Sequence, residues 1–89
     1  MDQALQYAAM ISEIIAKQSI ILGPDIAILK ARNVAELAVS DQGKVTDIKG
    51  EPAVALQKLI NEYVELSGMI VKNTLSSIFD KYPDIKKVE

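Results

Sequence analysis

The sequence predicts a domain of the α+β class that is mostly helical. Apolar residues recur every three or four positions over two long stretches, which is the spacing of a helix that buries one side. Between Glu36 and Ile48 the spacing changes to the alternation of a strand, and Gly-Pro and Gly-Glu-Pro mark helix starts. We expect two N-terminal helices, a β-hairpin at about 36–48 and a long C-terminal helix in one domain over residues 1–82, with a charged tail at 83–89.

The first helix is expected to run from Asp2, a suitable N-cap residue, to about Ile21. Its apolar stripe consists of Leu5, Ala8, Ile11, Ile15 and Leu22. Further apolar residues, among them Ile14, widen this stripe beyond the arc that faces a single core. The first helix is therefore expected to contact two neighbours.

Gly23 and Pro24 predict a corner after the first helix. Glycine readily adopts the left-handed conformation that ends a helix, and proline fits the first turn of the next one because its missing N–H is not needed there. In the second helix, Ile26, Leu29 and Val34 are expected to form one apolar side, with Ile28 facing elsewhere, and whether this helix is exposed stays open. The predicted result is a tight pair of helices.

The segment Ser40-Asp41-Gln42-Gly43-Lys44 predicts the turn of the hairpin. It fits a type I turn followed by a glycine in the left-handed conformation, which places Val39 opposite Val45. A two-stranded hairpin is marginally stable alone. We therefore expect it to lie on the helices or to pair with the hairpin of a second copy.

The C-terminal helix is expected to begin at Pro52 and to end at Tyr82-Pro83. Gly68 lies inside it and costs about 1 kcal/mol relative to alanine, so it marks either a kink or a close approach between helices. Two apolar stripes follow this helix, one through Leu56, Leu59, Ile60, Tyr63, Leu66 and Ile70 and the other through Val64, Val71, Leu75 and Ile78.

The apolar content predicts self-association. A chain of 89 residues has a small core, yet 49% of its residues are hydrophobic. We expect the first and last helices to pack antiparallel and to join those of a second copy in a dimeric helical bundle, or in a higher oligomer. The residues expected at this interface are Ile14, Ile60, Val64, Gly68, Val71 and Leu75.

The residue inventory argues against catalysis. The chain has no cysteine and no histidine, which removes thiolate nucleophiles, imidazole bases and the usual zinc ligands. Glu62 and Glu65 form a possible carboxylate pair and Lys72 a possible reactive amine, but solvated side chains on a helix explain all three more simply. We expect no catalytic residue, no cofactor and no metal site. The first functional hypothesis is thus a small interaction or regulatory module that binds itself and another protein.

A second hypothesis is a winged helix-turn-helix protein. The order of a helix, a corner, a helix at 24–33 and a hairpin is that of this class, and nucleic acid would contact Lys30, Arg32, Asn33 and Lys44. The formal net charge of −2 argues against it. Binding to nucleic acid would show as salt-sensitive retention that is lost when the lysine and arginine of the helix are replaced.

A third hypothesis is a sensor of a lipid or another apolar ligand, in which tyrosines and methionines line a gap in the bundle. The residues available for it are Tyr7, Tyr63, Met1, Met10 and Met69.

The expected location is the cytoplasm, because the chain lacks cysteine and has an acidic residue where a signal peptide needs positive charge. Glu13, Lys17 and the Gly-Pro pair interrupt the apolar stretch that begins at Ile11, so no membrane span is expected.

Overall fold

A computed structural model describes residues 3–82 and residue 85, apart from the side chains at 3, 4, 67 and 69. The predicted cap Asp2 and the tail positions 83–84 and 86–89 lie outside the described residues. Within the described part, an α+β fold that is mostly helical is confirmed. Its elements are α1 (Gln3–Leu22), α2 (Pro24–Arg32), β1 (Leu37–Val39), β2 (Val45–Ile48), α3 (Pro52–Ser67) and α4 (Met69–Lys81).

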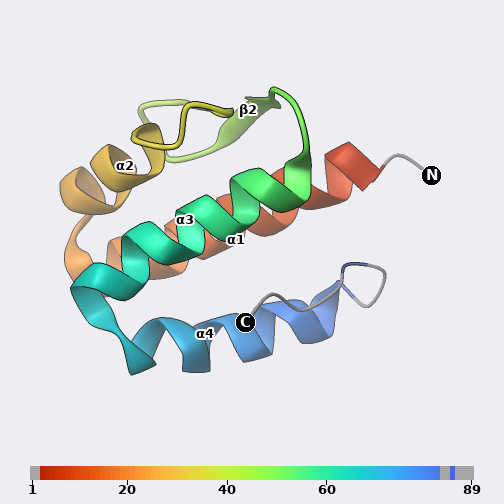
Figure 1. The fold of residues 1–89 in the computed structure, drawn as a ribbon. Helices are drawn as coiled ribbons and strands as arrows, with labels where there is room; N and C mark the ends of the chain where they lie inside the picture. The colour runs from red at the N-terminus through yellow and green to blue at the C-terminus, as the bar shows by residue number, and fades with distance from the viewer. Residues whose placement is uncertain (1–2, 83–84, 86–89) are drawn as a thin grey trace.

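The elements form three layers (Figure 1). Helices α1 and α3 make the middle layer and run in the same direction, while α2 and the hairpin cover one side of them. Helix α4 covers the other side and runs back antiparallel to α1 and α3. The expected antiparallel packing against the first helix therefore holds for α4 and not for α3.

The expected long C-terminal helix is two helices joined at Gly68. This glycine has φ 54° and ψ −117°, a conformation that residues with a side chain rarely adopt. The apolar stripes continue across it, so the sequence indicated a kink but not a reversal of direction. The reversal lets α4 fold back and bury its own apolar face against the same chain.

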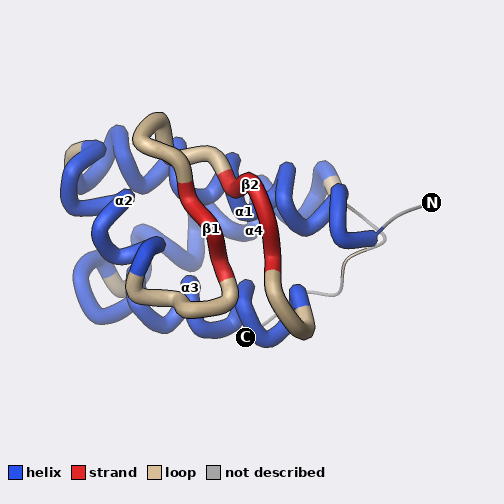
Figure 2. Tube along the Cα trace, turned by 90° about the horizontal axis from the view of Figure 1, so that it is seen from above, coloured by secondary structure: helices blue, strands red, loops and turns tan. Residues whose placement is uncertain are grey.

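The hairpin has the predicted register. Val39 pairs with Val45, and Gly43 has φ 81° at the turn, where its amide donates to the carbonyl of Ser40 at 2.9 Å. Ala38 pairs with Asp47, so Thr46 is an extra residue in β2, a bulge that the alternating pattern did not indicate. Figure 2 shows the two strands lying across the helices beneath them.

The hairpin is docked on its own chain, which is one of the two arrangements that we expected. The amide of Val45 donates to Ser12 Oγ of α1 at 2.9 Å, and this hydroxyl in turn donates to the carbonyl of Ala8 at 2.7 Å. At the turn, Gly43 is buried, and a Cβ added to it would lie 3.1 Å from Cγ2 of Ile15. The turn of the hairpin is therefore seated against α1.

The core lies between the layers and is mainly aliphatic. One buried polar link crosses it, because the hydroxyl of Tyr63 in α3 donates to the carbonyl of Ala27 in α2 at 2.7 Å. Ile85, expected in an exposed tail, is buried as well. The largest fully buried side chains include Met10, Ile11, Ile14, Ile15, Leu56, Leu59, Tyr63, Val71 and Ile78.

The buried side of α2 is formed by alanines and not by its larger apolar residues. Ala27 and Ala31 are its buried residues, whereas Ile26 and Leu29 are 48% and 60% exposed, and Ile28 is half-buried. The two alanines lie one turn apart, so they present a smooth side that lets α2 approach α3 closely enough for the tyrosine hydrogen bond. The predicted apolar side through Ile26 and Leu29 is therefore largely exposed, a point that the sequence left open.

Among the helices described, none combines the length and the low charge content that crossing a bilayer requires.

Candidate interaction surface

The structure places most of the expected interface residues inside the chain's own core. Ile14 and Val71 are fully buried, and Ile60 and Leu75 are at most 5% exposed. Val64 is partly buried and packs against this core. Because the chain reverses at Gly68, the stripe that was expected to meet a second copy meets α1 and α3 instead. In this fold these side chains offer little surface to another molecule.

Of the eight large apolar side chains that are exposed among the described residues, six lie around the two helix corners, while Leu5 and Val54 lie near the starts of α1 and α3. The corner between α1 and α2 and the corner between α3 and α4 lie at the same end of the molecule (Figures 1 and 2). We call the exposed residues there the corner surface, and each is between 41% and 81% exposed. The corner surface consists of Ile20, Ile21, Ile26, Leu29, Leu66 and Ile70.

Most residues of the corner surface could not be identified from the sequence, for a specific reason. A stripe analysis assigns the largest aliphatic residues to the interior, and here alanines take the interior positions of α2. By their spacing, Leu66 and Ile70 belong to a stripe that should be buried. They flank the reversal at Gly68, however, and their side chains are about half exposed. The available signal was the excess of apolar residues, which indicates that a surface exists without locating it.

Among the described residues of the four helices, five exposed charged side chains form no ion pair, and four of them lie in the halves of the helices nearer to the corners, with Asp80 at the far end of α4. Asp25 and Lys72 lie in the first turns of α2 and α4, Glu65 lies near the end of α3, and Lys17 lies in the C-terminal half of α1. All four are exposed, and none forms an ion pair with another residue that the structure describes. Two are acidic and two are basic, so this set of charges is neutral as a whole.

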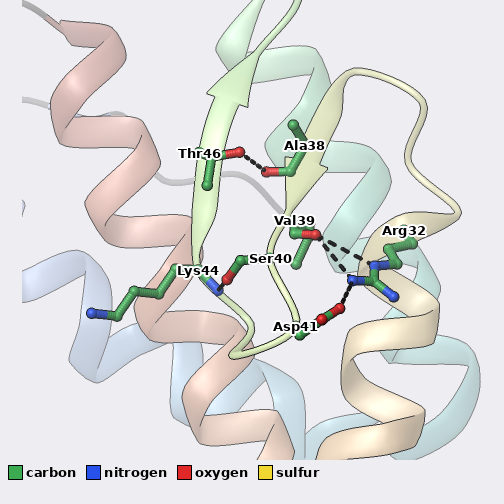
Figure 3. A network of polar contacts seen from close by, with 7 residues as sticks. All are labelled: Arg32, Ala38, Val39, Ser40, Asp41, Lys44 and Thr46. Atoms are coloured by element: carbon green, nitrogen blue, oxygen red, sulfur yellow. Dashed lines mark hydrogen bonds and ion pairs between the residues drawn. The ribbon is translucent and has the colours of Figure 1, made fainter.

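The residues proposed for nucleic-acid binding make contacts within the chain. Arg32 Nη2 lies 2.8 Å from Asp41 Oδ1, and its Nε and Nη2 donate to the carbonyl of Val39 at 3.4 and 3.3 Å (Figure 3). Lys44 lies on the other side of the turn and extends away from Arg32. The arginine thus ties α2 to the hairpin, and the two cations do not share a surface.

Glu62 of α3 contacts the other two residues proposed for nucleic-acid binding, Lys30 and Asn33. Its Oε1 accepts a hydrogen bond from Asn33 Nδ2 at 3.2 Å and lies 3.8 Å from Lys30 Nζ. A phosphate would therefore compete with a carboxylate for each of these side chains. At Gly43 the turn of the hairpin also lies against Ile15 of α1.

A closer ion pair joins the start of the hairpin to α3. Lys58 Nζ donates to Glu36 Oε2 at 2.6 Å. This hydrogen bond holds the pKa of Glu36 below its ordinary value. In the core, burial raises the pKa of the Tyr63 phenol, which stays protonated and available as a donor.

A groove of about 370 Å³ lies between α1 and α4. Five of the six residues that line it are polar or charged, which argues against an apolar ligand. The lining residues are Lys17, Asn73, Thr74, Ser77, Ile78 and Lys81. Of the residues proposed for the sensor, Met10 and Tyr63 are fully buried and Tyr7 is half-buried, while Met1 and the side chain of Met69 lie outside the described residues. Among the residues described, no group of three or more Asp or Glu side chains is arranged to hold a metal ion.

Comparison with protein-family models, with curated proteins and with solved structures gives no match to this chain.

Proposed function

We propose that this chain is a non-catalytic interaction module that associates with a second copy of itself through the corner surface. The observation that carries the proposal is the exposure of six large aliphatic side chains around two corners at one end of the molecule. Exposed aliphatic residues scattered singly need no explanation, whereas a group of them at one place is typical of a contact surface.

The size of this surface fits a small, reversible interface. A fully exposed leucine or isoleucine carries apolar area on the order of 100 Å², so six residues at 41–81% exposure present on the order of 300 Å² on each copy. A standard interface buries roughly 800 Å² on each partner, of which roughly 60% is apolar. The corner surface supplies more than half of that apolar area.

The neighbouring charges favour a second copy as the partner. In a two-fold symmetric pair, the same surface meets itself. A set of two acidic and two basic side chains is self-complementary, because Asp25 and Glu65 of one copy can face Lys17 and Lys72 of the other. A surface with one sign of charge would repel its own copy.

Sedimentation of charged variants tests the proposal. Leu29→Lys and Ile70→Lys place a cation on the corner surface and should lower the dimer fraction at least tenfold, because each desolvates a charge in the interface. Val54→Lys is the matched control, since Val54 is similarly exposed at the opposite end of α3 and should leave the dimer unchanged. The proposal fails if the wild type sediments as a monomer at all concentrations, or if the control abolishes the dimer as well as the corner variants do.

A further inference from the structure

We infer that α4 is exchanged between two copies of this chain. In the exchanged pair Gly68 adopts a helical conformation, α3 and α4 become one continuous helix, and α4 packs against α1 of the other copy. The inference rests on the proposed self-association and identifies the element that one copy gives to the other.

The hinge is one residue long. Helix α3 ends at Ser67 and α4 begins at Met69, and the amide of Gly68 already donates to the carbonyl of Val64 at 3.0 Å, as in a continuing helix. Among the described residues, no atom outside the hinge lies within 4 Å of a Cβ added at Gly68. Straightening therefore requires new dihedral angles at one unobstructed position, and the apolar stripes are already in phase across it.

The contacts of α4 can be recovered in full after exchange. Its buried side chains pack within the core, and at its C-terminal end Lys81 Nζ donates to Glu13 Oε1 of α1 at 2.5 Å. Each of these contacts re-forms between copies when α4 of one chain takes the place of α4 of the other. The equilibrium between the single chain and the exchanged pair then depends on the conformation of the hinge and on the surface that becomes buried only in the pair.

Two residues beside the hinge supply that surface. Leu66 and Ile70 are 45% and 51% exposed on either side of Gly68. In an exchanged pair the two straightened hinges pass close to each other, so each covers the aliphatic side chains of the other. Val71 and Leu75, which the sequence placed at a contact between copies, would then contact the second copy through the core.

Alanine at the hinge should raise the exchanged fraction. A positive φ is costly for alanine, whereas a helical φ is not. At each hinge, alanine therefore shifts the equilibrium from the reversed to the helical conformation by about tenfold. With two hinges in each pair, Gly68→Ala should strengthen dimerisation by about a hundredfold. Gly23→Ala is the matched control: Gly23 also has a positive φ, but Pro24 prevents α1 and α2 from merging into one helix, so dimerisation should not rise.

Zero-length crosslinking of the wild type identifies the exchange directly. Unlabelled and isotope-labelled chains are unfolded together and refolded, the dimer is isolated, and a carbodiimide joins Lys81 to Glu13 and Lys58 to Glu36. The two ion pairs are closely matched, at 2.5 and 2.6 Å with lysine exposures of 60% and 53%, but only the first spans the hinge.

Exchange predicts that the Glu13–Lys81 links join labelled to unlabelled peptides in the proportion that random pairing gives, while the Glu36–Lys58 links stay within one isotope. A dimer in which both links stay within one isotope overturns the exchange and leaves the proposed function intact. Absence of any dimer, in the wild type and in Gly68→Ala, overturns both.

Discussion

At the scale of single residues, the contact between Glu36 and Lys58 makes the clearest chemical prediction. The lysine hydrogen bond favours the ionised carboxylate in the folded chain, so the folded-state pKa of Glu36 lies below 4.5, its ordinary value. A lowered pKa contributes stability that is present above pH 4.5 and is lost as the pH falls through the folded-state value.

We expect an NMR titration of the Glu36 carboxyl to give a midpoint below 4.5 in the wild type and a return towards 4.5 in Lys58→Met. The denaturant midpoint of the wild type should fall over the same acidic range, and the variant should lose less of it. A carboxyl that titrates identically in the two proteins would show that the lysine is not the cause.

Much of the local chemistry of residues was predictable from the sequence. Gly43 takes the left-handed conformation that the turn requires, and Val39 faces Val45 because the length of the turn sets the register. The links of Ser12 to Val45 and of Arg32 to Val39 were not predictable, since they join segments whose relative placement is a property of the whole fold.

At the level of elements, the contact between the hairpin turn and α1 is the feature that would keep the hairpin from acting as a wing. Two glycines have nearly the same φ, 81° at Gly43 and 79° at Gly50, but of the two only Gly43 lies against another element. A Cβ at Gly43 would lie 3.1 Å from Ile15, whereas no described residue lies within 4 Å of one at Gly50. Comparing alanine variants of the two glycines therefore separates the free-energy cost of a positive φ from the cost of a close contact with α1.

Gly50→Ala should destabilise the chain by about 1 to 2 kcal/mol through conformation alone. Gly43→Ala should cost about 1 kcal/mol more, because the side chain of Ile15 or the turn must also shift by a few tenths of an ångström. Urea unfolding of the two variants measures the difference. Equal losses of stability would mean that the hairpin turn is free of the helices and could project as a wing.

The elements were mostly predictable, and their directions were less so. The corner at Gly23 and Pro24 follows from local chemistry, because the proline cannot continue α1 and fits the first turn of α2. Which side of α2 is buried depends instead on how closely it approaches α3, and that favours Ala27 over Ile26. The reversal at Gly68 likewise depends on the gain from packing α4 against α1, which spacing along one helix cannot show.

At the level of the whole molecule, most of the apolar residues lie either in the core or on the corner surface. The reversal of α4 brings most of the residues that were expected between copies into one chain's core, and the corner surface holds six of the eight large apolar side chains that stay exposed among the described residues. The sequence thus predicted that apolar surface remains, while its location required the fold. The proposed self-association should therefore occur at the corners.

The most direct test is a series of amide NMR spectra of the wild type from micromolar to millimolar concentration. If two copies associate through the corner surface, resonances of residues 20–29 and 64–72, at the two corners, change with concentration, while those of the hairpin strands and of the start of α3 change little. Spectra that do not change with concentration, or changes centred on the hairpin, would contradict this association.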